Sequence, residues 1–205
     1  MTSLDEVVAL SDDELNTRLK NLIEEVSILR GDFVLKSGLP SKWFIDGKKI
    51  VCHPVGVLYS AVALIRLIER TVADLSCNWP NAIGGLTMGA DPVSFTTASI
   101  SCALGKPIRS FSVRKEAKDH GGGGKIAGWL EEGDLVVVTE DVVSRGTSLV
   151  QAVDSIVEAG GSVLFATAIV DRGGSVGRLL EGWSIRFIPM FTALDFGLPF
   201  EGGLT

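Results

Sequence analysis

The sequence predicts an α/β protein built on a parallel twisted sheet flanked by helices, with a small N-terminal hood. From residue 54 onward, apolar runs of strand length alternate with amphipathic helical stretches, which is typical of a parallel sheet. The run 135–139 (LVVVT) is continuously apolar, as expected for a strand buried on both faces. The first fifty residues do not follow this alternation. We therefore expect an N-terminal helix and hood segment over 1–50 and a core over 51–205.

A capping box opens the first predicted helix. Ser11 stands three residues before Glu14, and apolar residues then recur at helical spacing. We expect this helix to run until Gly31 ends it. Two short strands, 33–35 and 43–45, follow around a turn at 37–40. A helix followed by a hairpin is the predicted structure of the hood.

The core elements are predicted from the alternation alone. Pro54 opens a helix, because proline is well tolerated in a first helical turn. We then expect, in order, a strand ending at 83–85, a helix over 91–104, a strand over 108–113, an irregular segment over 114–130, a strand over 135–139, a helix over 147–159, a strand over 163–170, and a tail with an edge strand at 185–189.

Composition excludes several classes of protein. The chain has 205 residues, of which 46% are hydrophobic and 21% charged, and its net charge is −6. This balance disfavours a partner that is nucleic acid or an anionic membrane. Residues 1–10 contain no basic residue, and no apolar run has the length of a membrane span, so we expect a cytoplasmic protein. The three cysteines form no CxxC pair and are expected to be buried reduced thiols.

Two adjacent carboxylates mark one strand-to-helix junction. Glu140 and Asp141 follow the strand at 135–139, and a hydroxyl- and glycine-containing turn over 144–148 opens the next helix. Free N–H groups at a helix N-terminus bind phosphate, and the carboxylates suit sugar hydroxyls or a Mg²⁺-bound ligand. The alternative is that Glu140 and Asp141 only cap the helix.

A basic segment forms the second cluster. Residues 106–125 hold six Lys and Arg residues against two acids, and they end in the glycines 121–124. The alternatives are a solvated surface loop and a flexible cationic lid that closes over an anion.

Both clusters resemble motifs of one enzyme family. The junction 136–149 is similar to the phosphoribosyl-pyrophosphate motif of type I phosphoribosyltransferases. The run 111–121 (FSVRKEAKDHG) resembles the mobile catalytic loop of orotate phosphoribosyltransferases. Weaker matches at 33–46, 84–92 and 169–173 extend the resemblance over about residues 30 to 175. Arg145 and Met88 depart from the family pattern, which usually has a small residue at the first position and in some members a lysine at the second.

The resemblance implies a fold, a reaction and a set of site residues. It implies the type I phosphoribosyltransferase fold and transfer of a phosphoribosyl group from phosphoribosyl pyrophosphate to orotate in pyrimidine biosynthesis. The implied catalytic residues are Lys118, His120, Glu140 and Asp141. The implied contacts to phosphoribosyl pyrophosphate are Lys36, Thr87, Arg114, Lys115, Lys118, His120, Glu140, Asp141, Val142, Val143, Ser144, Arg145, Gly146, Thr147 and Ser148. The implied contacts to orotate are Phe44, Ile45, Ser144 and Arg172.

The resemblance also implies a cofactor and an assembly. Mg²⁺ would arrive on phosphoribosyl pyrophosphate near Glu140 and Asp141, with no certain direct ligand from the protein. The mobile loop, 114–128, would serve the neighbouring subunit of a homodimer. Two alternatives remain open. A purine phosphoribosyltransferase should lack this basic loop, and a catalytically silent sensor of phosphoribosyl pyrophosphate that binds nucleic acid is disfavoured by the net charge of −6.

Overall fold

A five-stranded, mostly parallel sheet is the centre of the fold. The computed structural model describes residues 2–35, 38–118 and 124–203, without the side chains of Ala117 and Lys118. The strands are β3 (Ala82–Leu86), β4 (Arg109–Lys118), β5 (Gly124–Gly128), β6 (Leu135–Val138) and β8 (Ser162–Ala166). Their order is β5-β4-β3-β6-β8, and all neighbours are parallel except β5 against β4. The predicted sheet is confirmed.

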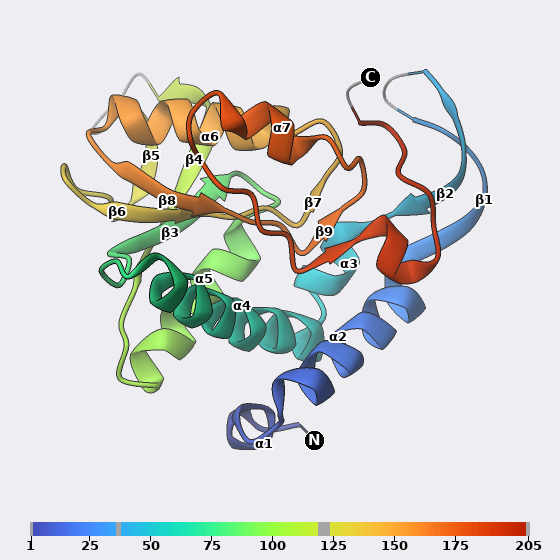
Figure 1. Cartoon of the computed structure of the whole chain (residues 1–205), viewed down its shortest axis with the longest axis horizontal. Helices are drawn as coiled ribbons and strands as arrows, with labels where there is room; N and C mark the ends of the chain where they lie inside the picture. The colour runs from blue at the N-terminus through green and yellow to red at the C-terminus, as the bar shows by residue number, and fades with distance from the viewer. Residues whose placement is uncertain (1, 36–37, 119–123, 204–205) are drawn as a thin grey trace.

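Helices cover both faces of this sheet. The helices α4 (Pro54–Leu75) and α5 (Asp91–Ala103) lie on one face, and α6 (Thr147–Glu158) and α7 (Val176–Glu181) lie on the other (Figure 1). Side chains of β6 alternate between the two resulting cores: Val137 faces the α4 side, whereas Val136 and Val138 face the α6 side. Burial on both faces explains why this strand is apolar throughout.

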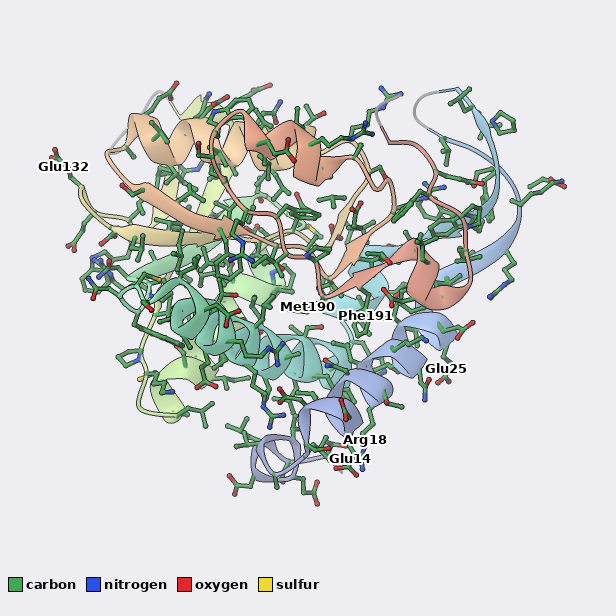
Figure 2. The ribbon with its side chains drawn as sticks, viewed as in Figure 1. Glu14, Arg18, Glu25, Glu132, Met190 and Phe191 are labelled. Atoms are coloured by element: carbon green, nitrogen blue, oxygen red, sulfur yellow. The ribbon has the colours of Figure 1, made fainter. Side chains whose placement is uncertain are left out.

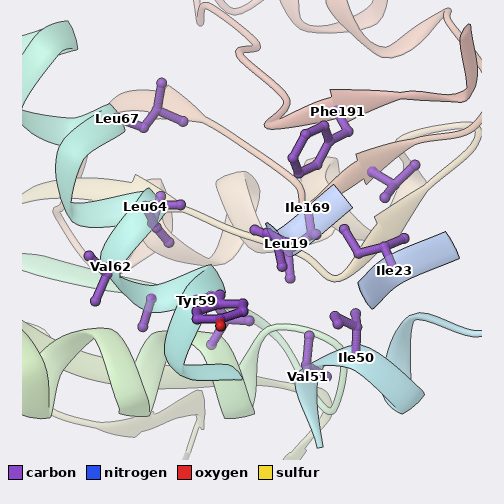
Figure 3. Packing of buried hydrophobic residues seen from close by; sticks show 14 of the residues in the cluster. Leu19, Ile23, Ile50, Val51, Tyr59, Val62, Leu64, Leu67, Ile169 and Phe191 are labelled. Carbon is purple, nitrogen blue, oxygen red and sulfur yellow. The ribbon is translucent and has the colours of Figure 1, made fainter. Parts of the chain in front are cut away.

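The N-terminal elements are α1 (Leu4–Val8), α2 (Asp12–Val26), β1 (Ile28–Val34), β2 (Pro40–Ile45) and α3 (Gly47–Val51). The predicted capping box at Ser11 and Glu14 is present. The exposed face of α2 carries Glu14 and Glu25 (Figure 2), and its buried face joins the core beside α4 through Leu19 (Figure 3). The antiparallel pair β1–β2 forms a separate sheet. The division into residues 1–50 and 51–205 stays a prediction.

A second small sheet joins three distant segments of the chain. The strands β7 (Val142–Val143), β9 (Val170–Asp171) and β10 (Phe191–Thr192) pair in the order β10-β9-β7, and the 3₁₀ helix η1 (Ala193–Phe196) follows. In the described part of the chain, no helix combines the length and apolar character needed to cross a bilayer.

Several predicted boundaries are wrong because tertiary pairing overrides local signals. The first helix ends at Val26 rather than at Gly31, since residues 28–34 pair with β2. The strand expected over 163–170 stops at Ala166, and Val170 joins the second sheet instead. The edge strand expected at 185–189 amounts to one bridge from Phe187. The helices α1, α3 and α7 were not predicted.

The basic segment and the cysteines also differ from expectation. Residues 114–118 continue β4, and residues 124–128 return antiparallel to it as β5, so the described part is a strand pair rather than an irregular loop. Hydrogen bonding to the edge of β4 accounts for this order. Cys52 and Cys102 are exposed and Cys77 is partly buried, so the prediction of buried thiols is wrong.

Candidate active site

A pocket opens beyond the carboxyl end of β6, next to the point where the order of the strands reverses. The chain passes from β3 to β4 on one side and later places β6 and β8 on the other side of β3. Open α/β sheets bind ligands at such a point, outside the carboxyl ends of the strands. The pocket has a volume of about 590 Å³ and is bounded by β2, α3, the turn between β6 and α6, Arg172 and Gly202.

The acid pair lies at the carboxyl end of β6. Glu140 and Asp141 are both buried, with 5% of each residue exposed. One oxygen of Asp141 accepts a hydrogen bond from the Val142 N–H at 2.7 Å, and Glu140 accepts one from the Asp141 N–H at 3.2 Å. Burial, and then the charge of Asp141, raise the pKa of Glu140 to about 8. Glu140 therefore holds a proton near neutral pH in the empty site.

Lys48 supplies a cation to this pair, and the sequence analysis missed it. Its ammonium nitrogen lies 2.9 Å from the second oxygen of Asp141. Burial lowers the pKa of Lys48, but the hydrogen bond and charge of Asp141 and the further attraction of Glu140 and Asp46 outweigh this, so the pKa is raised. Lys49 is adjacent to Lys48, and no signal in the sequence indicates which of the two lysines pairs with the acid pair. Its role follows from the packing of α3 against the end of β6.

Two glycines let other segments approach the acid pair closely. A Cβ at Gly89, in the loop after β3, would lie 1.6 Å from Glu140 Oε1. A Cβ at Gly47, in α3, would lie 2.6 Å from Asp141 Oδ2. A side chain at either position would displace a carboxylate oxygen, so the two glycines let three separate segments enclose the acid pair in this arrangement.

The turn between β6 and α6 presents an open helix N-terminus to the pocket. Gly146 is the N-cap of α6, and no side-chain hydrogen bond caps the helix among the described residues. The whole stretch 141–148 borders the pocket, including Ser144, Thr147 and Ser148. Uncapped N–H groups, the positive end of the helix dipole and three hydroxyl groups make this turn suitable for a phosphate.

Arg172 is a buried cation that borders the same pocket. Its Nη2 donates hydrogen bonds of 3.0 Å to Ser41 Oγ and to the Trp43 carbonyl oxygen. Its guanidinium carbon lies 4.6 Å from the centre of the Trp43 ring and 6.0 Å from that of Phe44. Burial lowers the pKa of Arg172, and the charge of Glu201 opposes this. Phe44 and Ile45 form the adjacent wall of the pocket.

The other predicted contacts do not line this pocket. The Arg114 guanidinium donates to the carbonyl oxygens of Gly124 and Ile126 at 3.3 and 3.5 Å, and Lys115 is exposed. The Thr87 hydroxyl donates to Asp91 at 2.7 Å. Only the backbone of Lys118 is described, at the end of β4. Lys36 and His120 fall outside the described residues. The roles of all these residues stay predictions.

The donor set at the acid pair is small for a metal ion. Among the described residues, no group of three or more His, Cys, Asp or Glu side chains lies close enough together to hold one. Glu140 and Asp141 supply carboxylate oxygens, which Mg²⁺ accepts, but the remaining ligands must come from elsewhere. The site therefore fits a Mg²⁺ ion that arrives with oxygen ligands of its own.

Comparison with known proteins yields relatives across nearly the whole chain. A scan against models of known protein families gives no match. The orotate phosphoribosyltransferase of Nostoc sp. is 36% identical over 182 residues, which cover 88% of this chain and 84% of the relative. The crystal structure of Mycobacterium tuberculosis orotate phosphoribosyltransferase with Fe(III) dicitrate superposes with a TM-score of 0.74 at 32% identity, covering 90% of this chain and 99% of that one.

A second structure of the mycobacterial enzyme contains a ligand relevant to the pocket. It is the complex with 5-phospho-α-D-ribosyl 1-diphosphate, which matches with a TM-score of 0.67 at 30% identity over 90% of this chain and 99% of that one. The mixed, mostly parallel sheet flanked by helices is the fold that these structures share with this chain. The extent and identity of these matches show that the chain belongs to the orotate phosphoribosyltransferase family.

Proposed function

We propose that this chain transfers a 5-phosphoribosyl group from phosphoribosyl pyrophosphate to orotate, giving orotidine 5′-phosphate and pyrophosphate, a step of pyrimidine biosynthesis. One observation carries the proposal: a single pocket joins Asp141 of the acid pair, an open helix N-terminus, and a buried arginine beside an aromatic wall. These features suit, respectively, the hydroxyl groups of a sugar, a phosphate, and a planar base with a carboxylate. The similarity to orotate phosphoribosyltransferases supports it.

The sugar phosphate would bind along the turn that follows β6. The N–H groups and hydroxyls at 144–148 would hold the 5′-phosphate, and Arg145 adds a positive charge at the rim of the pocket. Glu140 and Asp141 would accept hydrogen bonds from the ribose hydroxyls. The negative charge of Asp141, and of Glu140 once it has lost its proton, would also stabilise the positive charge that develops at the anomeric carbon.

Orotate would bind in the pocket beside Arg172. Arg172 would pair with its carboxylate, Phe44 and Ile45 would contact the ring, and Ser144 would lie at its edge. A ring nitrogen of orotate then forms a bond to the anomeric carbon while the bond from that carbon to the pyrophosphate oxygen breaks, and the proton of that nitrogen passes to the departing pyrophosphate or to solvent. The reaction needs no nucleophile from the protein, so catalysis is positioning and charge stabilisation.

The departing pyrophosphate would be neutralised by cations of the basic segment. Arg114, Lys115, Lys118 and His120 are the proposed contacts, and Lys36 and Thr87 are proposed to bind phosphoribosyl pyrophosphate. When bound, Mg²⁺ would supply positive charge to the pyrophosphate oxygens. The protein residues that would lie nearest to it are Glu140 and Asp141, which precede the phosphate turn in the chain.

We further propose a homodimer in which the segment 114–128 acts on the neighbouring subunit. Most of the described part of this segment is exposed and projects beyond the sheet on β4 and β5. Among the described residues of the segment, none lines the pocket of its own subunit. We also propose a cytoplasmic protein with no nucleic-acid or membrane partner, which agrees with its net charge of −6.

The proposed reaction can be tested with purified protein, Mg²⁺ and phosphoribosyl pyrophosphate by following the loss of orotate absorbance. We expect orotate to be consumed and adenine and hypoxanthine to be left unchanged. Consumption of a purine but not of orotate would assign the chain to purine substrates. Binding of phosphoribosyl pyrophosphate without turnover of any of the three bases would indicate a sensor.

A further inference from the structure

The last described residues of the chain cover the base end of the pocket. Gly202 borders the pocket together with Phe44 and Arg172. The backbone N–H of Glu201 donates to the Arg172 carbonyl oxygen at 3.0 Å, which fixes this segment beside the arginine. Figure 1 shows the C-terminal segment running alongside β1 and β2. The C-terminal segment is therefore part of the site, although it was assigned no role in the sequence analysis.

Arg172 is held in place by neutral groups. Its Nη2 donates to Ser41 Oγ and to the Trp43 carbonyl oxygen, and the guanidinium stacks on the Trp43 ring. Its backbone N–H donates to the Val143 carbonyl oxygen at 2.8 Å. These contacts determine where the guanidinium lies. A further partner is not needed to position it.

Glu201 places a negative charge beside Arg172 but does not fix the position of its guanidinium group. Its Oε2 lies 3.4 Å from Nη2, beyond the usual distance of about 2.7–2.9 Å for a strong charge-assisted hydrogen bond. It also accepts a hydrogen bond from the Ser41 hydroxyl. The Glu201 side chain is 24% exposed, whereas that of Arg172 is 6% exposed. The carboxylate thus lies on the solvent side of the cation and can leave it without unfolding the segment.

The pairing leaves Arg172 incompletely satisfied. Its Nε is buried and donates to no atom of the described residues. An unused donor on a buried cation is unfavourable, so a carboxylate that engages two donors at once would be a better partner than Glu201 at 3.4 Å. The carboxylate of orotate has that geometry.

We propose that Glu201 is the resident counter-ion of Arg172 in the empty site and that the carboxylate of the base displaces it on binding. This inference rests on the proposed function. Glu201 neutralises a cation that would otherwise be buried without charge compensation. It also competes with orotate, because two carboxylates beside one guanidinium repel each other. The affinity for orotate is therefore set by an exchange of carboxylates rather than by simple addition of one.

Glu201→Gln tests this exchange because glutamine keeps the shape and loses the charge. We expect the KM for orotate to fall about threefold to tenfold in this variant, as for loss of a partly exposed charge contact. Uracil, which resembles orotate without the carboxylate, displaces nothing. Its inhibition constant against orotate should therefore stay the same or rise. Glu132→Gln is the control for net charge, since Glu132 is exposed and lies at the far end of the sheet from β1 and β2 (Figure 2).

Three outcomes would overturn the inference. They are an unchanged KM for orotate in Glu201→Gln, an increased one, or equal decreases for orotate and uracil, which would indicate a general opening of the pocket. Lack of orotate turnover by the unaltered protein is a different result and contradicts the proposed function instead. A fall in the KM for orotate without a matching gain for uracil supports the exchange.

Discussion

Two charged regions of this protein serve one proposed substrate but are built in opposite ways. The acid pair follows β6, is buried, and is closely approached by two other segments at Gly47 and Gly89. The basic segment extends from the edge of the sheet on β4 and β5, and Lys115 and Lys125 are exposed. Buried charges need partners and a fixed position, because leaving them unpaired costs stability. Exposed cations stay hydrated and need no such frame.

This difference indicates which region should act in substrate binding and which in the transition state. The acid pair and the α6 turn are supported by two apolar cores and form a preorganised binding site. The described residues of the basic segment do not line the pocket of their own subunit, and under the proposed mechanism the segment approaches the pyrophosphate bound to the neighbouring subunit. Its contribution should therefore appear mainly in the transition state, whereas that of the acid pair should appear in folding and binding as well.

Replacement of a lid cation should have the largest effect. Lys118→Ala should lower kcat by about 10²- to 10³-fold while changing the KM for phosphoribosyl pyrophosphate little, because its charge matters most as the leaving group departs. Lys125→Ala, in the adjoining strand β5, is the matched control and should retain most activity. Steady-state kinetics of both variants check this. Equal losses in kcat and in substrate affinity for Lys118→Ala would contradict a role mainly in the transition state.

A mixture of inactive variants tests whether the lid acts across a dimer. Lys118→Ala and Asp141→Asn, combined under conditions that exchange subunits, should regain part of the activity because one hybrid site then has both groups intact. The measurement is the activity of the mixture against that of each variant alone. Hybrid dimers with no regained activity would place the lid over its own subunit.

Removal of Glu140 should change how the stability of the folded chain depends on pH. The pKa of Glu140 is about 8 in the folded chain against 4.5 as the ordinary value, so between these pH values the folded state binds more protons than the unfolded state. The free energy of unfolding therefore falls as pH rises through this range, by at most about 1.4 kcal/mol per pH unit. Glu140→Gln removes this dependence. Its Tm relative to the unaltered protein should rise between pH 5 and 8 and then level off, and a constant difference would contradict the raised pKa.

Loss of the lysine beside the acid pair should have the smallest effect. Lys48→Gln should reduce kcat/KM for phosphoribosyl pyrophosphate about threefold to tenfold, since half of its side chain is exposed and the pair is screened by solvent. Lys49→Gln removes the same charge from the neighbouring position of α3 and is expected to have little effect. If the two variants have the same kinetics, Lys48 does not act through Asp141.

Local signals in the sequence accounted for most secondary elements. Ser11 and Glu14 predicted the start of α2, Pro54 that of α4, and the apolar run at 135–138 a strand buried on both faces. These predictions succeed because a capping box, a proline at a helix start and an unbroken apolar run can each be recognised within a short stretch of sequence. The end of α2 and the strand pair β4–β5 were missed because pairing with a distant segment decides them.

The sequence alone determined the α/β fold class, the position of Glu140 and Asp141 at the end of a buried strand, and the hydroxyl- and glycine-containing turn beside them. These features depend on residue order within one strand–turn–helix unit, so they can be read without the rest of the chain. Only the tertiary structure decided that Lys48 pairs with Asp141 and that Glu201 reaches Arg172. Those partners lie far apart along the chain, and their contact depends on how α3 and the C-terminal segment pack against the second sheet.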